Sequence, residues 1–143
     1  MTLYKLTEET KTTTSGITLY RIELTEDCDW GKAGTKGGWV EKESNLIEDA
    51  WIADNAQVYG NAQISSDARI FGNAWVYGNA IVSGDAWVSG DARIFDNAQV
   101  SCNAEVYGDA LVYGYAWISG DAQVYGDARV SSGGHDGFSG NSV

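Results

Sequence analysis

A six-residue pattern, aliphatic-x-x-Asn/Asp-Ala-x, repeats from Leu46 to Val130 without an insertion or a deletion. An aliphatic residue occupies every sixth position, and the position four residues after it is Ala in every unit from Ala50 to Ala128. A register this strict requires that one backbone geometry is repeated and stacked along the chain. The repeat therefore restricts the fold to a solenoid of short, equivalent units.

Each unit combines a short strand with a sharp corner. In the unit 74–77, Ala-Trp-Val-Tyr, the alternation of side chains places Ala74 and Val76 inside and the other two residues outside. The Gly and Asn/Asp residues that follow supply the left-handed backbone conformations of a tight corner. Six residues are too few to form a hairpin and keep this register. We therefore expect three short parallel sheets arranged as a triangular prism, with three units in each coil.

A coil of three units takes 18 residues, and the outward residues test this period. Sorting every third unit separates them into an aromatic face, a serine face and a mixed face. The aromatic face carries Tyr59, Tyr77, Phe95 and Tyr113; the serine face carries Ser65, Ser83, Ser101 and Ser119; the mixed face carries Ala53, Phe71, Ser89, Tyr107 and Tyr125. This separation supports the 18-residue coil independently of the six-residue pattern.

The segments on either side of the repeat follow other rules. In residues 1–45, two alternating stretches at 4–7 and 17–24 flank a polar segment, which predicts an N-terminal β-hairpin that caps the open end of the stack. Residues 26–38 are rich in Gly, Asp and Lys and are predicted to form a loop. Residues 131–143 are small and polar, and we expect them to be flexible or to fold over the other end.

The repeat resembles the left-handed parallel β-helix of hexapeptide-repeat proteins, whose aliphatic first position and small fifth position are matched across residues 46–130. The left-handed sense is what this resemblance implies, since parallel crossovers are otherwise almost always right-handed. More narrowly, the lead-in Gly-Gly-Trp-Val at 37–40 and the segment 19–22 before it are similar to small proteins of bacteria, phages and prophages. The resemblance therefore implies an all-β, left-handed β-helix with 18 residues per coil, and it implies no particular activity.

Composition excludes several classes of protein. No run of 18 or more apolar residues is present, and the first residues lack a cationic region followed by an apolar one, so we expect neither a membrane span nor a signal peptide. The formal net charge of −11 argues against direct binding of nucleic acid or an anionic membrane. Cys28 and Cys102 give no disulfide framework or zinc-binding spacing. We therefore expect a cytoplasmic protein.

The repeat lacks the usual equipment of enzymes with this fold. Acyltransferases, the best-known hexapeptide-repeat proteins, use a histidine base and often a loop extruded from the coils. Here the repeat contains neither, and the one histidine of the chain, His135, lies in the tail. One histidine cannot supply the three zinc ligands of the carbonic anhydrases that share this fold. We predict no catalytic residue and no cofactor.

Two columns of corner residues are largely acidic, and a metal site has to be considered there. The first column is Asp49, Asp67, Asp85, Asn103 and Asp121, and the second is Asn55, Asn73, Asp91, Asp109 and Asp127. Carboxylates stacked about 4.8 Å apart lie close enough to bridge calcium. However, Asn and Asp are also the standard non-glycine corner residues, and the spacing is not that of nonapeptide calcium repeats. We interpret these residues as corners and predict no metal site.

The aromatic face is the strongest candidate for binding. Trp75, Arg93 and Leu111 flank its column of rings. Monomers seldom expose so much contiguous apolar area without using it, and Tyr, Trp and Arg are favoured at interface hot spots. We predict a binding face formed by Tyr59, Trp75, Tyr77, Arg93, Phe95, Leu111 and Tyr113. A purely structural interpretation stays open, since same-face aromatic pairs also stabilise sheets.

These observations predict a non-catalytic, rigid binding or scaffold module, associated with a phage or prophage, that uses the aromatic face for a protein partner or for a homotrimer. One alternative is an acidic inhibitor of a basic host protein, such as a nucleic-acid-binding or defence protein. Another is an acyltransferase-like enzyme that needs a further subunit. A carbohydrate-stacking track is disfavoured, because Trp51, Trp75, Trp87 and Trp117 are expected on different faces or at different heights.

Overall fold

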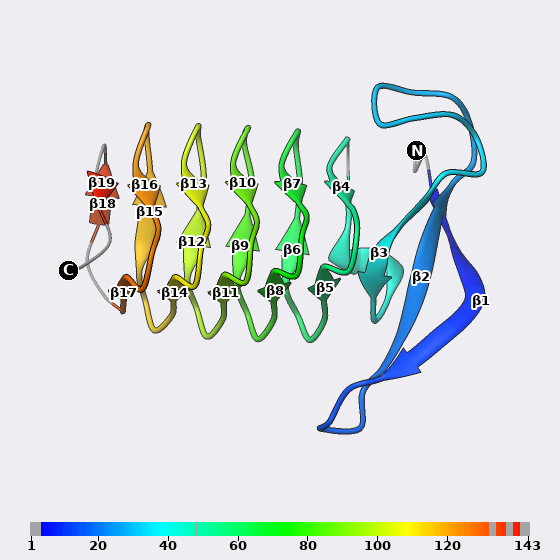
Figure 1. Cartoon of the computed structure of the whole chain (residues 1–143), viewed down its shortest axis with the longest axis horizontal. Coiled ribbons are helices and arrows are strands. Elements are labelled where there is room, and N and C mark those ends of the chain that lie inside the picture. Colours follow the sequence, from blue (N-terminus) through cyan, green and yellow to red (C-terminus); the bar gives the residue numbers. More distant parts are fainter. Residues whose placement is uncertain (1–3, 48, 132–133, 137–138, 141–143) are drawn as a thin grey trace.

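The structure, a computed structural model, describes residues 4–47, 49–131, 134–136 and 139–140. It is an all-β parallel solenoid whose coils stack along one axis (Figure 1). The expected fold class and 18-residue coil are confirmed: Gln57 pairs in parallel with Trp75, and Trp75 pairs with Arg93. The left-handed sense of the coil stays a prediction.

Three sheets run the length of the solenoid, and we name them after their outward faces. The aromatic sheet has the order β1-β2-β3-β5-β8-β11-β14-β17, the mixed sheet β19-β16-β13-β10-β7-β4, and the serine sheet β18-β15-β12-β9-β6. Within the coils, the aromatic sheet contains β5 (Gln57–Val58), β8 (Trp75–Val76), β11 (Arg93–Ile94), β14 (Leu111–Val112) and β17 (Arg129–Val130). The mixed sheet contains β4 (Trp51–Ile52), β7 (Arg69–Ile70), β10 (Trp87–Val88), β13 (Glu105–Val106) and β16 (Gln123–Val124). The serine sheet contains β6 (Gln63–Ile64), β9 (Ile81–Val82), β12 (Gln99–Val100) and β15 (Trp117–Ser119).

The core is formed by the inward Ala and Val/Ile residues of the repeat. From Ala56 to Val130 each of them is at most 1% exposed. Burial of a Val or Ile side chain contributes roughly 1.5–3 kcal/mol relative to exposure. The corners also belong to the ladder, since the backbone N–H of Asn61 donates to the carbonyl of Gly78 at 2.8 Å. A single insertion would break both the core and the corner bonds, which explains the strict register.

The N-terminal segment lies against the first coil. β1 (Tyr4–Thr12) is antiparallel to β2 (Thr18–Leu24), and β2 is antiparallel to β3 (Lys36–Val40). β3 pairs in parallel with β5, so it joins the antiparallel strands to the solenoid. A 3-10 helix, η1 (Glu43–Asn45), then leads into the coils.

The predicted loop over residues 26–38 is wrong at its last three residues, because β3 begins at Lys36. The glycines that suggested a turn have another role. A Cβ on Gly37 would lie 2.5 Å from the carbonyl oxygen of Ile52, and one on Gly38 would lie 2.5 Å from the side chain of the same residue. Glycine is therefore required there for close packing within a strand.

The described part of the tail continues the stack. β18 (Gly134–Asp136) pairs in parallel with β15, and β19 (Ser139–Gly140) pairs in parallel with β16. His135 belongs to β18, where its backbone is paired with Ile118. The other residues of the tail from 132 onward lie outside the described residues.

Candidate binding surfaces

The four rings predicted on the aromatic sheet form one continuous stack. The ring centroids of Tyr59 and Tyr77 are 5.0 Å apart, those of Tyr77 and Phe95 5.2 Å, and those of Phe95 and Tyr113 5.3 Å. The three interplanar angles are 3°, 5° and 7°. Because neighbouring parallel strands lie about 4.8 Å apart, the 18-residue register sets this stacking directly.

The stack is exposed along only part of its length. Tyr59 is 9% exposed and packs with Leu19 and Trp39 of the N-terminal segment, which leaves it little surface for a partner. Tyr77, Phe95 and Tyr113 are half-buried. Burial raises the pKa of Tyr59 and of Tyr77 above the ordinary value of a tyrosine. The accessible part of the predicted face therefore begins at Tyr77.

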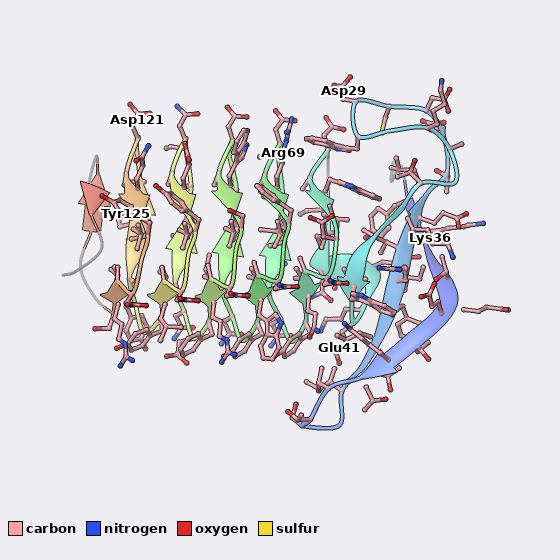
Figure 2. All side chains as sticks on the ribbon, in the orientation of Figure 1. Asp29, Lys36, Glu41, Arg69, Asp121 and Tyr125 are labelled. Atoms are coloured by element: carbon pink, nitrogen blue, oxygen red, sulfur yellow. The ribbon has the colours of Figure 1, made fainter. Side chains whose placement is uncertain are left out.

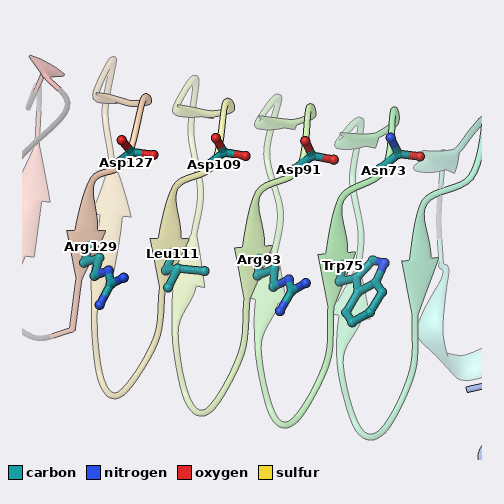
Figure 3. A pocket seen from close by; sticks show the side chains of 8 residues that line it. All are labelled: Asn73, Trp75, Asp91, Arg93, Asp109, Leu111, Asp127 and Arg129. Carbon is teal, nitrogen blue, oxygen red and sulfur yellow. The ribbon is translucent and has the colours of Figure 1, made fainter. Parts of the chain in front are cut away.

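A groove of about 460 Å³ lies on the aromatic sheet (Figure 3). Its floor alternates apolar and basic side chains, and a row of corner residues forms its rim (Figure 3). The groove is lined by Asn73, Trp75, Asp91, Arg93, Asp109, Leu111, Asp127 and Arg129. The guanidinium carbon of Arg93 lies 4.5 Å from the ring centroid of Trp75. The structure thus brings the predicted Trp75, Arg93 and Leu111 together in one column.

The groove is rich in charged side chains that form no ion pair with one another. Among the described residues, no ion pair or hydrogen bond joins Arg93 or Arg129 to the three aspartates of the rim. The rim carboxylates and the guanidinium groups are therefore available to a second molecule. Tryptophan and arginine are enriched at protein interfaces, whereas aspartate is depleted from their cores and fits the polar rim.

A second cluster, on the mixed sheet, was not predicted. Residues between β2 and β3 form a loop that places Trp30 against the coils, and the indole N–H of Trp30 donates to the carbonyl of Asp49 at 2.8 Å. The guanidinium carbon of Arg69 lies 4.3 Å from the ring centroid of Trp30 and 5.2 Å from that of Trp87. Phe71 meets Trp87 edge-on, with centroids 6.2 Å apart. Arg69 is thus held between two indoles.

Part of this cluster was visible in the sequence. Trp51, Arg69 and Trp87 are 18 residues apart and pair in register on the mixed sheet. Trp51 and Trp87 therefore share one column at heights two coils apart, while Trp75 and Trp117 lie on the other two sheets, as expected from the sequence. Sorting the residues before each aliphatic position would have shown this column. The repeat pattern does not predict the position of Trp30, because this residue lies in a loop outside the repeat.

The most exposed large apolar residues lie away from the predicted face. They are Ile81, Trp87, Tyr115 and Trp117, with exposed fractions of 37%, 43%, 78% and 56%. Ile81 and Trp117 belong to the serine sheet, and Tyr115 occupies a corner between the aromatic and serine sheets. The largest exposed apolar side chains therefore lie on the serine and mixed sheets and at one corner, not on the face of the aromatic sheet.

The corners do not form a metal centre in the part of the chain that the structure describes. No group of three or more His, Cys, Asp or Glu side chains there is arranged to hold a metal ion. Among the same residues, no helix has the length and apolarity needed to cross a membrane. Figure 2 shows Asp121 at the tip of its coil, where the corner residues point away from the solenoid axis.

Comparison with known proteins supports the fold. A protein-family model described as the YdcK Beta solenoid repeat matches residues 62–78, 74–90, 104–120 and 122–137. No curated protein matches the chain. The described residues of the matched segments belong to the stacked strands and corners of the solenoid, so this similarity, together with the structure, identifies a repeat β-helix protein.

Proposed function

We propose that this repeat β-helix protein is a rigid, non-catalytic binding module whose aromatic sheet docks a protein partner. The observation that carries the proposal is the groove on the aromatic sheet, where Trp75, Arg93 and Leu111 lie under a rim of aspartates that form no ion pair among the described residues. Trp and Arg are enriched among residues that dominate binding energy. Trp75, Arg93 and Leu111 project from strands that are paired in one sheet, so little backbone ordering is left for binding.

The charges of the groove define the kind of partner. Asp91, Asp109 and Asp127 outnumber the two arginines on its floor, and the whole chain carries a formal net charge of −11. Long-range attraction favours a partner with a basic contact surface. Inhibition of a basic host protein is one activity that such docking would produce. A cytoplasmic location and an association with a phage or prophage belong to the same proposal, as does the left-handed coil.

Capture from a lysate of the organism that encodes the protein tests this proposal. The intact chain and a Trp75→Ala/Leu111→Ala variant are used as baits at low and high salt. An Ile81→Ala/Trp117→Ala variant is the matched control, because it removes an aliphatic residue and a tryptophan from the serine sheet. We expect one partner to bind the chain and the control at low salt, to dissociate at high salt, and to be lost from the first variant.

The same samples distinguish partner docking from self-association. A solution mass near 15.4 kDa indicates a monomer whose aromatic sheet is free, whereas three times that mass indicates a trimer. If the intact chain is a trimer and the Trp75→Ala/Leu111→Ala variant is a monomer, the aromatic sheet serves self-association and not the docking of another protein. A monomer that captures the same proteins with all three baits would exclude the aromatic sheet as the docking surface.

A further inference from the structure

We propose that the mixed sheet carries a carbohydrate-binding site at Trp30, Arg69 and Trp87, and that the site takes a neutral sugar ring such as a hexose or an N-acetylhexosamine. This site lies on a different sheet from the groove assigned to a protein partner. The inference therefore goes beyond the proposed function and does not depend on it.

The site exists because the loop between β2 and β3 folds back over the first coils. The hydrogen bond from Trp30 to Asp49 fixes the loop to a corner of the solenoid. Figure 2 shows Asp29 on this loop, on the side of the molecule where the corner residues of the coils project. A flat sheet face is thereby converted into a walled depression, and walls are what a small ligand needs.

Two hollows share the residues Trp30, Arg69 and Trp87. One, of about 500 Å³, also contacts Asp29, Asp67 and Asp85, among other residues. The other, of about 320 Å³, is lined in addition by further aromatic side chains, Trp51 and Phe71. Both volumes fall in the range of small-molecule sites, about 300–1,000 Å³. The combination of indole walls with a few polar groups is the composition expected of such a site.

The polar groups of the site are available for hydrogen bonds. Among the described residues, no hydrogen bond or ion pair is made by the guanidinium of Arg69 or by the carboxylates of Asp67 and Asp85. Arg69 therefore offers donors, while the two aspartates offer acceptors. A sugar hydroxyl both donates and accepts, so a ring with several hydroxyls satisfies both kinds of group.

Charge selects a neutral ligand. An anion would meet the carboxylates of Asp29, Asp49, Asp67 and Asp85 around the larger hollow. A cation would meet the guanidinium of Arg69, which already occupies the space between the two indoles. A neutral ring avoids both repulsions. Trp87 is 43% exposed, so its indole also offers the flat apolar surface on which the C–H face of a sugar packs.

An array of immobilised glycans tests this inference with the full chain. The array contains neutral oligosaccharides of hexose and N-acetylhexosamine, together with sulfated and uronic-acid glycans. We expect the chain to retain neutral glycans and not the acidic ones. Calorimetry with the best-retained neutral glycan should then show that Trp87→Ala and Arg69→Ala each weaken binding about tenfold or more, the loss expected when one good contact is removed.

Trp117→Ala is the matched control, because Trp117 is an exposed tryptophan at the same position of a repeat unit on another sheet. It should leave the glycan affinity unchanged. Trp87→Phe keeps an aromatic ring and gives a smaller loss than Trp87→Ala, so the result does not depend on one variant. Retention of no neutral glycan, retention of acidic glycans alone, or equal losses in Trp87→Ala and Trp117→Ala would each overturn the assignment. None of these outcomes bears on protein capture by the aromatic sheet.

Discussion

The carboxylate of Asp96 accepts a hydrogen bond, 3.0 Å long, from the backbone N–H of Gly114 one coil further along. Asp96 has a φ of +59°, in the left-handed region that residues other than Gly, Asn and Asp seldom adopt. Asp54 bonds the backbone N–H of Gly72 in the same way at 3.1 Å. The bond to the next coil offsets the steric cost of the corner, so aspartate serves where most corners use glycine.

Cys102 occupies an equivalent corner with a φ of +60° and has no carboxylate to form such a bond. We predict that Cys102→Gly raises the free energy of unfolding by about 0.5–1 kcal/mol, because relief of the left-handed strain exceeds the added entropy of the unfolded chain. Asp96→Gly should give no such gain, since it also removes a hydrogen bond. Urea denaturation followed by circular dichroism measures both. Equal gains in the two variants would show that the Asp96 bond adds nothing.

Asn45 joins η1 to the first coil through its side chain. It is fully buried, accepts from the backbone N–H groups of Glu41 and Lys42 at 3.1 and 2.9 Å, and donates to the carbonyls of Gly60 and Ala62 at 3.2 and 2.9 Å. Both the oxygen and the nitrogen of the Asn45 amide therefore form hydrogen bonds. Among the described residues, its loss would leave the N–H of Lys42 and the carbonyls of Gly60 and Ala62 without a partner, whereas the N–H of Glu41 also donates to the carbonyl of Val58 at 3.2 Å.

We predict that Asn45→Ala lowers the free energy of unfolding by roughly 2–4 kcal/mol, because several buried polar groups lose their bonds. Asn45→Asp should be worse at neutral pH, since a carboxylate would face two carbonyl oxygens. Asn61→Ala is the control: its amide is exposed and makes side-chain bonds to Lys42 and Asn79 at 3.3 Å. Urea denaturation measures both variants. If Asn45→Ala lowers the free energy of unfolding as little as Asn61→Ala does, the Asn45 amide does not stabilise the junction between η1 and the first coil.

The aromatic stack and the core were predictable from the sequence because both follow from period alone. Once Val58 and Val76 are aligned at 18 residues, Tyr59 and Tyr77 must lie one above the other. The sequence could not show how much of the stack is covered. Tyr59 is buried by Leu19, which lies outside the repeat and reaches the stack through antiparallel pairing.

The second cluster marks the limit of periodic reasoning. The column of Trp51, Arg69 and Trp87 obeys the 18-residue period and was open to prediction. The position of Trp30 depends on the path of a non-repetitive loop and on one hydrogen bond to Asp49, which no pattern encodes. Sites built by the repeat alone can be found from sequence, whereas sites completed by an inserted loop require the structure.

Tyr4 makes the free energy of unfolding decrease at alkaline pH. Its hydroxyl lies 2.6 Å from the carbonyl oxygen of Glu43 and 2.7 Å from that of Leu46, and burial, together with the charge of Glu43, raises the pKa of Tyr4 to about 12. The unfolded chain releases this proton near pH 10, whereas the folded chain keeps it. The contribution of Tyr4 is therefore complete below pH 10 and is lost between pH 10 and about 12.

We predict that the urea midpoint of the intact chain falls more steeply between pH 10 and 12 than that of Tyr4→Phe. The difference between the two proteins is the quantity to measure. Tyr20→Phe is the control, because Tyr20 lies on the neighbouring strand β2 and is half-buried. Parallel pH profiles for the intact chain and Tyr4→Phe would show that the Tyr4 hydroxyl does not retain its proton on folding.

Position within the ring stack should decide what each ring contributes to stability. Tyr77 stacks on both Tyr59 and Phe95, whereas Tyr113 stacks on Phe95 alone. An aromatic pair contributes about 0.5–1.5 kcal/mol beyond burial of its area. Tyr77→Ala should therefore lower the free energy of unfolding by about 1–3 kcal/mol through lost stacking, roughly twice the loss from Tyr113→Ala.

Tyr77→Phe is the control for this prediction, because the Tyr77 hydroxyl makes no hydrogen bond among the residues that the structure describes and the ring is kept. Its free energy of unfolding should match that of the intact chain in urea denaturation. Equal losses from Tyr77→Ala and Tyr113→Ala would mean that each ring is stabilised by its own strand and not by its neighbours. In that case stacking between neighbouring coils would contribute nothing to the stability of the aromatic sheet.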